Sequence, residues 1–277
     1  LMHVSFVIIL IGAAITRFIG YEGTMHVREG ESSDVMLSDA TYITVEWNNH
    51  GNSEILQQKV LYSSAGWQAS DFKLKKGKDK INIKTLAFVP DASAALTAVD
   101  DGEPIISLFA LTNTSRETLI LRQGDSVQVE DIFIAFCELD NKPGISLSIE
   151  NGRLFASATK DIYLSSMGSQ QSDSLKAGSI FPFESMKFYA IDNVKLVLHA
   201  FEPSGAIYPV PARNPSDGSG LDAVLLQIEH NQKTKEIAVW GKRGVVGEKT
   251  IVRNFDGGNL KLSFGSIPIK LPFSLYL

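Results

Sequence analysis

The N-terminal segment Leu1–Tyr21 constrains this chain most strongly, because it is apolar over nearly its whole length. Between Val4 and Ile15 the only polar residue is Ser5. An α-helix rises about 1.5 Å per residue, so a helix over this segment would be roughly 30 Å long, the thickness of a hydrocarbon core. We therefore predict one transmembrane helix over residues 1–21. Because Leu1 is not an initiator methionine, we expect a fragment whose helix begins upstream.

Two other interpretations of this segment stay open from the residues alone. The uninterrupted apolar run is only about a dozen residues long, which also fits a helix buried in the core of a soluble domain. A cleaved signal peptide would need a basic residue before the apolar run and a small-x-small cleavage site after it. No Lys or Arg precedes Val4, and Arg17 follows the run with no Ala-x-Ala beside it.

The composition of the chain limits its partners and its chemistry. With 277 residues, 44% of them hydrophobic and 21% charged, the chain is long enough to bury a sizeable core. The formal net charge of −5 argues against a basic surface for nucleic acid. Cys137 is the only cysteine, so an intrachain disulfide and a multi-cysteine zinc site are excluded. We expect its thiol to be buried in a strand and inert.

After residue 21, apolar residues recur at every second position, which is typical of strands with one buried face. In Tyr42–Trp47 the side chains of Ile43, Val45 and Trp47 share one face of such a strand. Similar runs return about every ten residues, with turn signals between them and no long helical period. We predict that residues 22–277 form one elongated, mainly β domain, an antiparallel sandwich or open barrel.

Two hairpins and one short helix are predicted in more detail. Residues 145–149 and 153–158 flank Asn151-Gly152, a pair that readily adopts the positive φ angles of a tight hairpin turn. Residues 224–230 and 235–240 flank a second turn at 231–234. The Ala-rich stretch Asp91–Ala98 is the one helix that we expect beyond the N-terminal segment.

The sequence contains no motif of nucleophilic, phosphate-binding or metal-dependent catalysis, so we expect no catalytic residue in this chain alone. Four histidines lie without a partner histidine at metal-ligand spacing, and we expect each at the surface or half-buried: His26, His50, His199 and His230. His3 differs because it belongs to the apolar segment, where an ionisable group is costly and is usually kept for a ligand, a proton or a partner. The residues alone leave two readings of His3 open, an interfacial imidazole or a ligand to haem iron.

Both ends of the chain resemble one family. The segment His3–Gly23, continuing through Met25–Glu31, resembles the ResB (CcsB) family of cytochrome c biogenesis proteins. The C-terminal segment Leu260–Leu275 is similar to a strand pair late in the extracytoplasmic domain of that family. The resemblance implies a bacterial inner-membrane protein with a large extracytoplasmic β domain, here residues 22–277, next to a transmembrane helix.

The resemblance also implies partners and a role. Such a protein works with, or is fused to, a ResC (CcsA) membrane partner, and together they carry haem across the bilayer for attachment to apocytochrome c. His3 occupies the position of the family's intramembrane haem ligand, so we expect it to be an axial ligand of haem iron, the only metal expected here. The alternative is a membrane-anchored β-sandwich that binds other proteins or envelope polymers and has no haem role.

Overall fold

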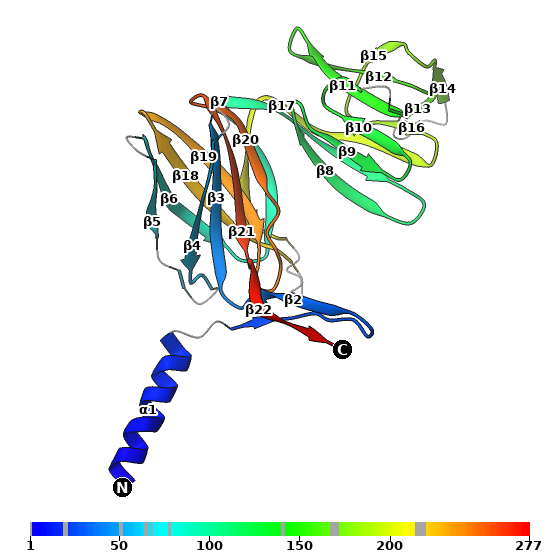
Figure 1. Cartoon of the computed structure of the whole chain (residues 1–277). Coiled ribbons are helices and arrows are strands. Elements are labelled where there is room, and N and C mark those ends of the chain that lie inside the picture. The colour runs from blue at the N-terminus through cyan, green and yellow to red at the C-terminus, as the bar shows by residue number, and fades with distance from the viewer. Residues whose placement is uncertain are drawn as a thin grey trace. The chain divides into compact units, whose positions relative to one another are not determined.

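The protein is mainly β, as Figure 1 shows for a computed structural model of the chain. The structure describes residues 2–18, 22–49, 52–63, 66–67, 69–76, 79–139, 142–166, 172–213 and 220–277. Within these residues the one helix is α1 (Met2–Phe18), and the other elements are strands. The mainly β fold with an N-terminal helix, which the sequence predicts, is therefore confirmed.

The chain forms two compact units, which we call unit 1 and unit 2. Unit 1 comprises Leu1–Ala94 and Pro209–Leu277, and unit 2 comprises Ala95–Tyr208. Both boundaries fall inside long strands, β7 (Ala92–Leu111) and β17 (Val194–Pro211). The segment for which the sequence analysis predicts a single β domain thus contains two units, and each has its own hydrophobic core.

Unit 1 contains a sandwich of two four-stranded sheets. Their strand orders are β20-β21-β3-β4 and β19-β18-β6-β5. The strands are β3 (Thr41–Asn49), β4 (Asn52–Val60), β5 (Asp71–Lys76), β6 (Asp79–Val89), β18 (Asp222–His230), β19 (Lys233–Gly241), β20 (Thr250–Phe255) and β21 (Gly258–Gly265). Two such sheets bury their apolar faces against each other.

Strand β3 shows how alternation builds this core. Ile43 and Val45 are completely buried and Trp47 is 6% exposed, and all three belong to one apolar cluster. The opposite sheet contributes residues of β6 and β18, such as Ile83 and Val224, to the same cluster. The two-residue period in the sequence therefore predicts the buried face of β3 correctly.

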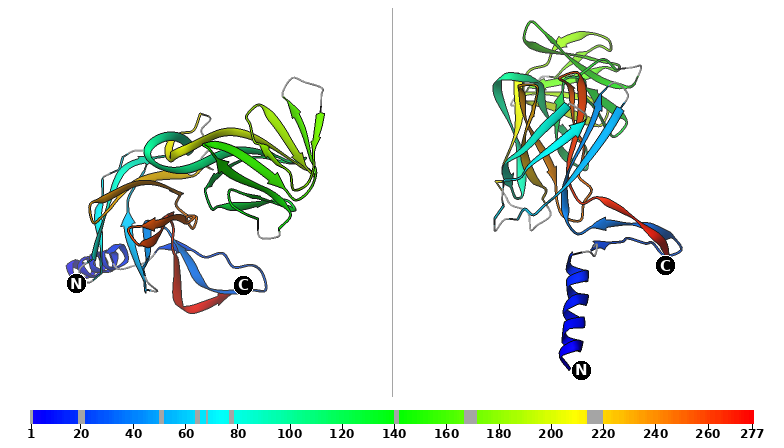
Figure 2. Two further views of the ribbon diagram at one scale, coloured as in Figure 1. Left: turned by 90° about the horizontal axis from the view of Figure 1, so that it is seen from above. Right: turned by 60° about the vertical axis from the view of Figure 1, so that its left-hand side comes forward.

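A smaller sheet extends from the sandwich of unit 1, and both views in Figure 2 show its two long strands projecting side by side. Its order is β1-β2-β22, with β1 (Gly23–Thr24), β2 (Ser32–Ser38) and β22 (Pro268–Tyr276). The family resemblance predicts a strand pair in the segment Leu260–Leu275, and this segment does contain two strands. They lie in different sheets, however, because β21 pairs with β3 whereas β22 pairs with β2.

Unit 2 is a second sandwich. Its sheets have the orders β14-β13-β16-β17-β7-β8 and β15-β12-β11-β10-β9, and most pairings are antiparallel, although β10 and β11 run parallel. The remaining strands are β8 (Arg116–Arg122), β9 (Ser126–Val129), β10 (Ile132–Ala135), β11 (Gly144–Glu150), β12 (Arg153–Ala158), β13 (Ile162–Ser166), β14 (Ser172–Leu175), β15 (Ile180–Pro182) and β16 (Lys187–Ile191).

Both predicted hairpins are confirmed. Strands β11 and β12 pair across Asn151 and Gly152, whose φ angles are 50° and 74°, as a primed turn requires. Strands β18 and β19 pair across Asn231 and Gln232, whose φ angles are 47° and 68°. This second turn is tighter than expected, because two residues assigned to the turn, Lys233 and Thr234, already belong to β19.

The predicted short helix at 91–98 is wrong, because this stretch begins strand β7. Asp91 takes a φ of 46°, which turns the chain sharply at the point where a helix would start. Its backbone N–H donates to Oδ1 of Asp222 at 3.0 Å, and the N–H of Ala92 donates to the carbonyl of Leu221 at 2.7 Å. These long-range bonds outweigh the helix propensity of alanine, which is worth only a few tenths of a kcal/mol per residue, roughly.

Candidate functional site

The helix α1 carries His3, the residue that the sequence singles out. The helix forms because this segment has no proline and its one internal glycine, Gly12, is followed by two alanines. The side chain of His3 is exposed, and so are the side chains of every residue from 3 to 15. Within the residues that the structure describes, no hydrogen bond or ion pair holds the imidazole of His3.

The apolar surface of α1 surrounds the helix. Its large apolar side chains are more than half exposed, from 51% at Val7 to 67% at Ile9, and they include Phe6, Ile8, Leu10 and Ile11. Successive helical residues are rotated by about 100°, so a run of six exposed apolar residues covers all faces. Moving such side chains out of water yields about 1.5–3 kcal/mol each, which sums to on the order of 10 kcal/mol for the helix.

The length of α1 bears on whether the helix could cross a membrane. The helix has 17 residues. Among the residues described by the structure, no helical segment combines the length and the hydropathy of a membrane span.

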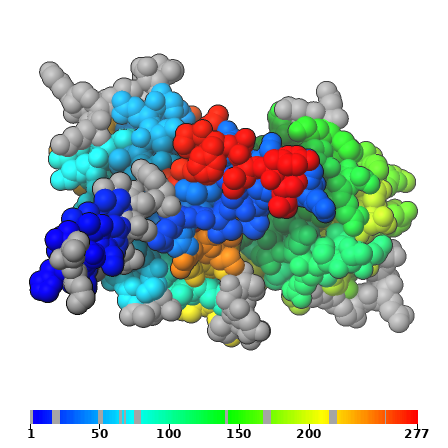
Figure 3. Space-filling view, turned by 60° about the horizontal axis from the view of Figure 1, so that its bottom comes forward, coloured from blue at the N-terminus to red at the C-terminus, as the bar shows by residue number. Residues whose placement is uncertain are grey.

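A short connection ties α1 to the small sheet of unit 1. Helix α1 ends at Phe18 and β1 begins at Gly23, and five residue steps of extended chain span at most about 18 Å. The small sheet also exposes apolar side chains near the C-terminal end of β22: Phe273 (54%), Leu275 (51%) and Tyr276 (77%). Figure 3 shows this end of the chain, in red, at the surface beside the blue β2.

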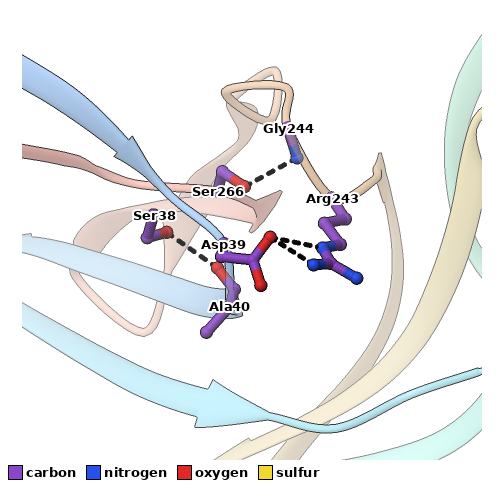
Figure 4. Close-up of polar contacts among 6 residues, drawn as sticks. All are labelled: Ser38, Asp39, Ala40, Arg243, Gly244 and Ser266. Carbon is purple, nitrogen blue, oxygen red and sulfur yellow. Dashed lines mark hydrogen bonds and ion pairs between the residues drawn. The ribbon is translucent and has the colours of Figure 1, made fainter. Parts of the chain in front are cut away.

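Polar contacts hold the small sheet to the sandwich, and Figure 4 shows them at the corner between β2 and β3. We call Ser38, Asp39, Arg243 and Ser266 the corner clamp. The guanidinium of Arg243 donates from Nε to Oδ1 of Asp39 at 2.7 Å and also from Nη2 to the same oxygen. This hydrogen bond from Arg243 to the carboxylate raises the pKa of the guanidinium above its ordinary value. The pair is largely exposed, so it contributes modestly to stability.

The two serines of the corner clamp are almost fully buried, each 2% exposed. The hydroxyl of Ser38 donates to the carbonyl of Ala40 at 2.7 Å and accepts from the N–H of Ile267 at 3.0 Å. The hydroxyl of Ser266 accepts from the N–H of Gly244 at 2.8 Å. These bonds satisfy backbone groups where the chain leaves one sheet for another, so the clamp fixes where the small sheet begins.

A second polar cluster lies at the β18–β19 turn of unit 1. His230 is only 4% exposed, so the expectation of a surface or half-buried residue is wrong here. Its Nδ1 lies 2.8 Å from Oδ2 of Asp256, without the alignment of a hydrogen bond, and its ring packs edge-on against Trp47 with centroids 4.5 Å apart. Hydrogen bonds from Lys233 and then Asn231 lower the pKa of Asp256 below its ordinary value.

The other predicted residues are scattered. His26 is exposed between β1 and β2, and His199 is exposed on β17, where its ring lies 4.5 Å from that of Phe109. His50 lies outside the described residues. Cys137 is half-buried just after β10 rather than buried within a strand. In the described parts of the chain, no three His, Cys, Asp or Glu side chains gather as a metal site.

Sequence reasoning missed the corner clamp and the buried His230–Asp256 contact. Asp39 and Arg243 are 204 residues apart, and neither lies in a recognisable motif. The alternation in β18 did carry a signal for His230, because its position continues the buried series of Val224, Leu226 and Ile228. That period places the imidazole on the buried face.

Comparison with known proteins finds similarity over one stretch at the start of the chain. Residues 1–58 match the model of the ResB-like family. Protein NrfI of Wolinella succinogenes is 51% identical over 45 residues, which is 16% of this chain and 5% of that protein. The family match covers α1, the strands β1 to β3 and most of β4, and it includes His3, Ser38 and Asp39. The resemblance noted at residues 260–275 lies outside this match.

Proposed function

We propose, because the first 58 residues of this chain are ResB-like, that the protein is a subunit or half of a membrane complex for cytochrome c maturation. In this complex α1 lies in the bacterial inner membrane and presents His3 to haem, which is the cargo. The two β units lie on the extracytoplasmic side. A ResC/CcsA-like partner, separate or fused, and apocytochrome c complete the assembly.

The observation that carries the proposal is the helix whose apolar surface faces outward on all sides. A helix that is apolar all round is normally buried, either in a large protein core or in lipid. Here the large apolar side chains of α1 remain exposed in the described chain, so their burial must come from outside it. A bilayer and the helices of a membrane partner both meet that requirement.

His3 is chemically suited to bind haem. It is the only ionisable side chain between Met2 and Thr16, and the imidazole of histidine is a common axial ligand of haem iron. Phe6 and Val7 lie three and four residues further along, on the same face of the helix, and both are exposed. They would offer an apolar wall to the porphyrin beside the imidazole. One histidine supplies one axial ligand to the iron.

The proposal is tested by replacing His3 in the protein purified from membranes together with its ResC-like partner. We expect His3→Gly to reduce the haem recovered per protein at least fivefold and to alter its absorption spectrum. Added imidazole should restore both, because it can occupy the space that the side chain leaves. His26→Gly is the matched control, since His26 is also exposed but lies outside the helix.

Retention of haem with an unchanged spectrum in His3→Gly would refute the ligand role. That result would favour the second candidate function, a membrane-anchored β-sandwich that binds other proteins. Its support is the architecture itself, because two sandwiches make up most of the described chain.

A further inference from the structure

The outer face of the six-stranded sheet in unit 2 departs from the usual pattern of a sandwich. Strands normally alternate core-facing apolar residues with outward polar ones. On β7, β16 and β17 the core side holds Leu108, Tyr189 and Leu196. Neighbouring positions on the opposite side hold Phe109 and Phe188. Both sides of this sheet therefore carry large apolar residues.

Two adjoining pockets lie on this outer face. The first has a volume of about 410 Å³ and is lined by residues that include Phe109, Arg116, Met186 and His199. The second has a volume of about 360 Å³ and is lined by residues that include Tyr163 and Lys195. Phe188 lines both pockets, so they form one surface, which we call the aromatic floor. Each volume falls in the range of small-molecule sites.

The charges on the aromatic floor have one sign. Arg116 lies over the ring of Phe109, with its guanidinium carbon 4.4 Å from the ring centroid. Arg116 and Lys195 are the charged residues of the lining, and it contains no carboxylate. Neither cation forms an ion pair within the part of the chain that the structure describes. The whole chain carries a net charge of −5, so a local excess of positive charge is not a general property of its surface.

The backbone at the rim of the first pocket is strained. Met186 adopts a φ of 65° and its side chain is 65% exposed. A non-glycine residue with this φ costs on the order of 1 kcal/mol, and such residues concentrate at binding sites. An exposed, flexible methionine beside aromatic rings suits contact with a flat apolar ligand.

We propose that the aromatic floor binds a flat, largely apolar molecule that carries carboxylates, of the porphyrin class. The rings of Phe109, Phe188 and His199 contact the flat body of the ligand. Arg116 and Lys195, on the two pockets, bind its carboxylates. The class of ligand follows from the floor itself, and the choice of porphyrin rests on the proposed function, in which haem is the cargo. This floor would be a second porphyrin site, separate in the chain from His3.

The test is a titration of the full chain in detergent with metal-free protoporphyrin IX. The emission of the porphyrin is the readout, because the three tryptophans, Trp47, Trp67 and Trp240, all lie in unit 1. We expect Arg116→Gln to weaken binding about tenfold, through loss of a charge-assisted hydrogen bond. Phe188→Leu should weaken it roughly threefold to tenfold through loss of stacking. Arg153→Gln, an exposed arginine on the other sheet of unit 2, is the matched control and should bind normally.

Two results would overturn the proposal. Equal binding by Arg116→Gln, Phe188→Leu and the unchanged chain would show that the porphyrin binds elsewhere. Equal binding of protoporphyrin dimethyl ester would show that the cations do not recognise the carboxylates. The probe has no iron, so this titration does not report on ligation by His3. Failure of the haem test at His3 and failure of this titration are therefore separate outcomes.

Discussion

Helix α1 and strand β3 both lie in the ResB-like stretch and both carry large apolar residues, but these residues are exposed in the helix and buried in the strand. In β3 the side chains of Ile43 and Val45 are completely buried, whereas in α1 the side chain of Ile9 is 67% exposed. The chain therefore buries apolar side chains efficiently where its own strands pack together. We therefore interpret the exposed apolar surface of α1 as a surface that contacts lipid or a partner protein.

The largest expected effect is a difference in the free energy of unfolding between a variant in β3 and a variant in α1. Ile43→Ala should lower the free energy of unfolding by about 2–5 kcal/mol, because it leaves a cavity in the sandwich of unit 1. Ile9→Ala, the same chemical change in α1, should leave that free energy unchanged. Urea unfolding in detergent measures both, with the fluorescence of buried Trp47 as the probe. An equal loss in the two variants would mean that α1 packs into the protein core.

The next effect concerns membrane association. A lysine in place of Ile9 should disfavour insertion by about 2.5–3.5 kcal/mol, because it puts a charge in the apolar middle of the helix. We expect much less of this variant in the alkali-resistant membrane fraction. Leu61→Lys is the control, since Leu61 is 81% exposed in unit 1 outside the helix. If both variants stay in the membrane equally well, α1 is not the membrane-embedded part.

A smaller effect is expected at the corner clamp. Ser38→Ala should cost about 1 kcal/mol, because it leaves the partly buried N–H of Ile267 and carbonyl of Ala40 without their side-chain partner. Faster amide hydrogen exchange in β2 and β22 would report the loosened small sheet. Ser33→Ala, which removes exposed bonds to Val35, should change little. Unaltered exchange in Ser38→Ala would show that the clamp does not hold the small sheet.

The smallest effect is a pH dependence in unit 1. Lys233 and Asn231 lower the folded-state pKa of Asp256 below the ordinary 3.8, so the carboxylate stabilises the fold at pH values above 3.8. This contribution is lost as the pH falls through the lowered folded-state pKa. Asp256→Asn should therefore be less stable than the unchanged chain near neutral pH, and the two should converge in strong acid. Urea unfolding across pH would contradict this if the difference stayed constant.

The sequence predicts the local parts of this fold well. The alternation in residues 42–47 identifies the buried face of β3, and Asn151-Gly152 identifies a hairpin turn. Both signals depend on near neighbours in the chain, which is why they can be read directly. The apolar run at the start of the chain likewise predicts the N-terminal helix. The ligand role proposed for His3 has no such local signal, because it would depend on haem and on a partner outside the chain.

The missed features depend on distant contacts. The stretch at 91–98 has the composition of a helix, but Asp222 and Leu221, more than a hundred residues later, fix it as a strand. The two-unit division is hidden for a similar reason, because its boundaries fall inside β7 and β17 and not in a linker. The pairing of Asp39 with Arg243 has no local signal, since folding alone brings them together.

The most direct test of our account is the position of α1 relative to the bilayer. Cys137→Ser removes the only cysteine, and Ile9→Cys or Leu61→Cys then allows a single fluorescent label in reconstituted liposomes. We predict strong quenching of the label at residue 9 by lipids with a quencher deep in the acyl chain, and no quenching at residue 61. A label at residue 9 that those lipids do not quench would contradict the account.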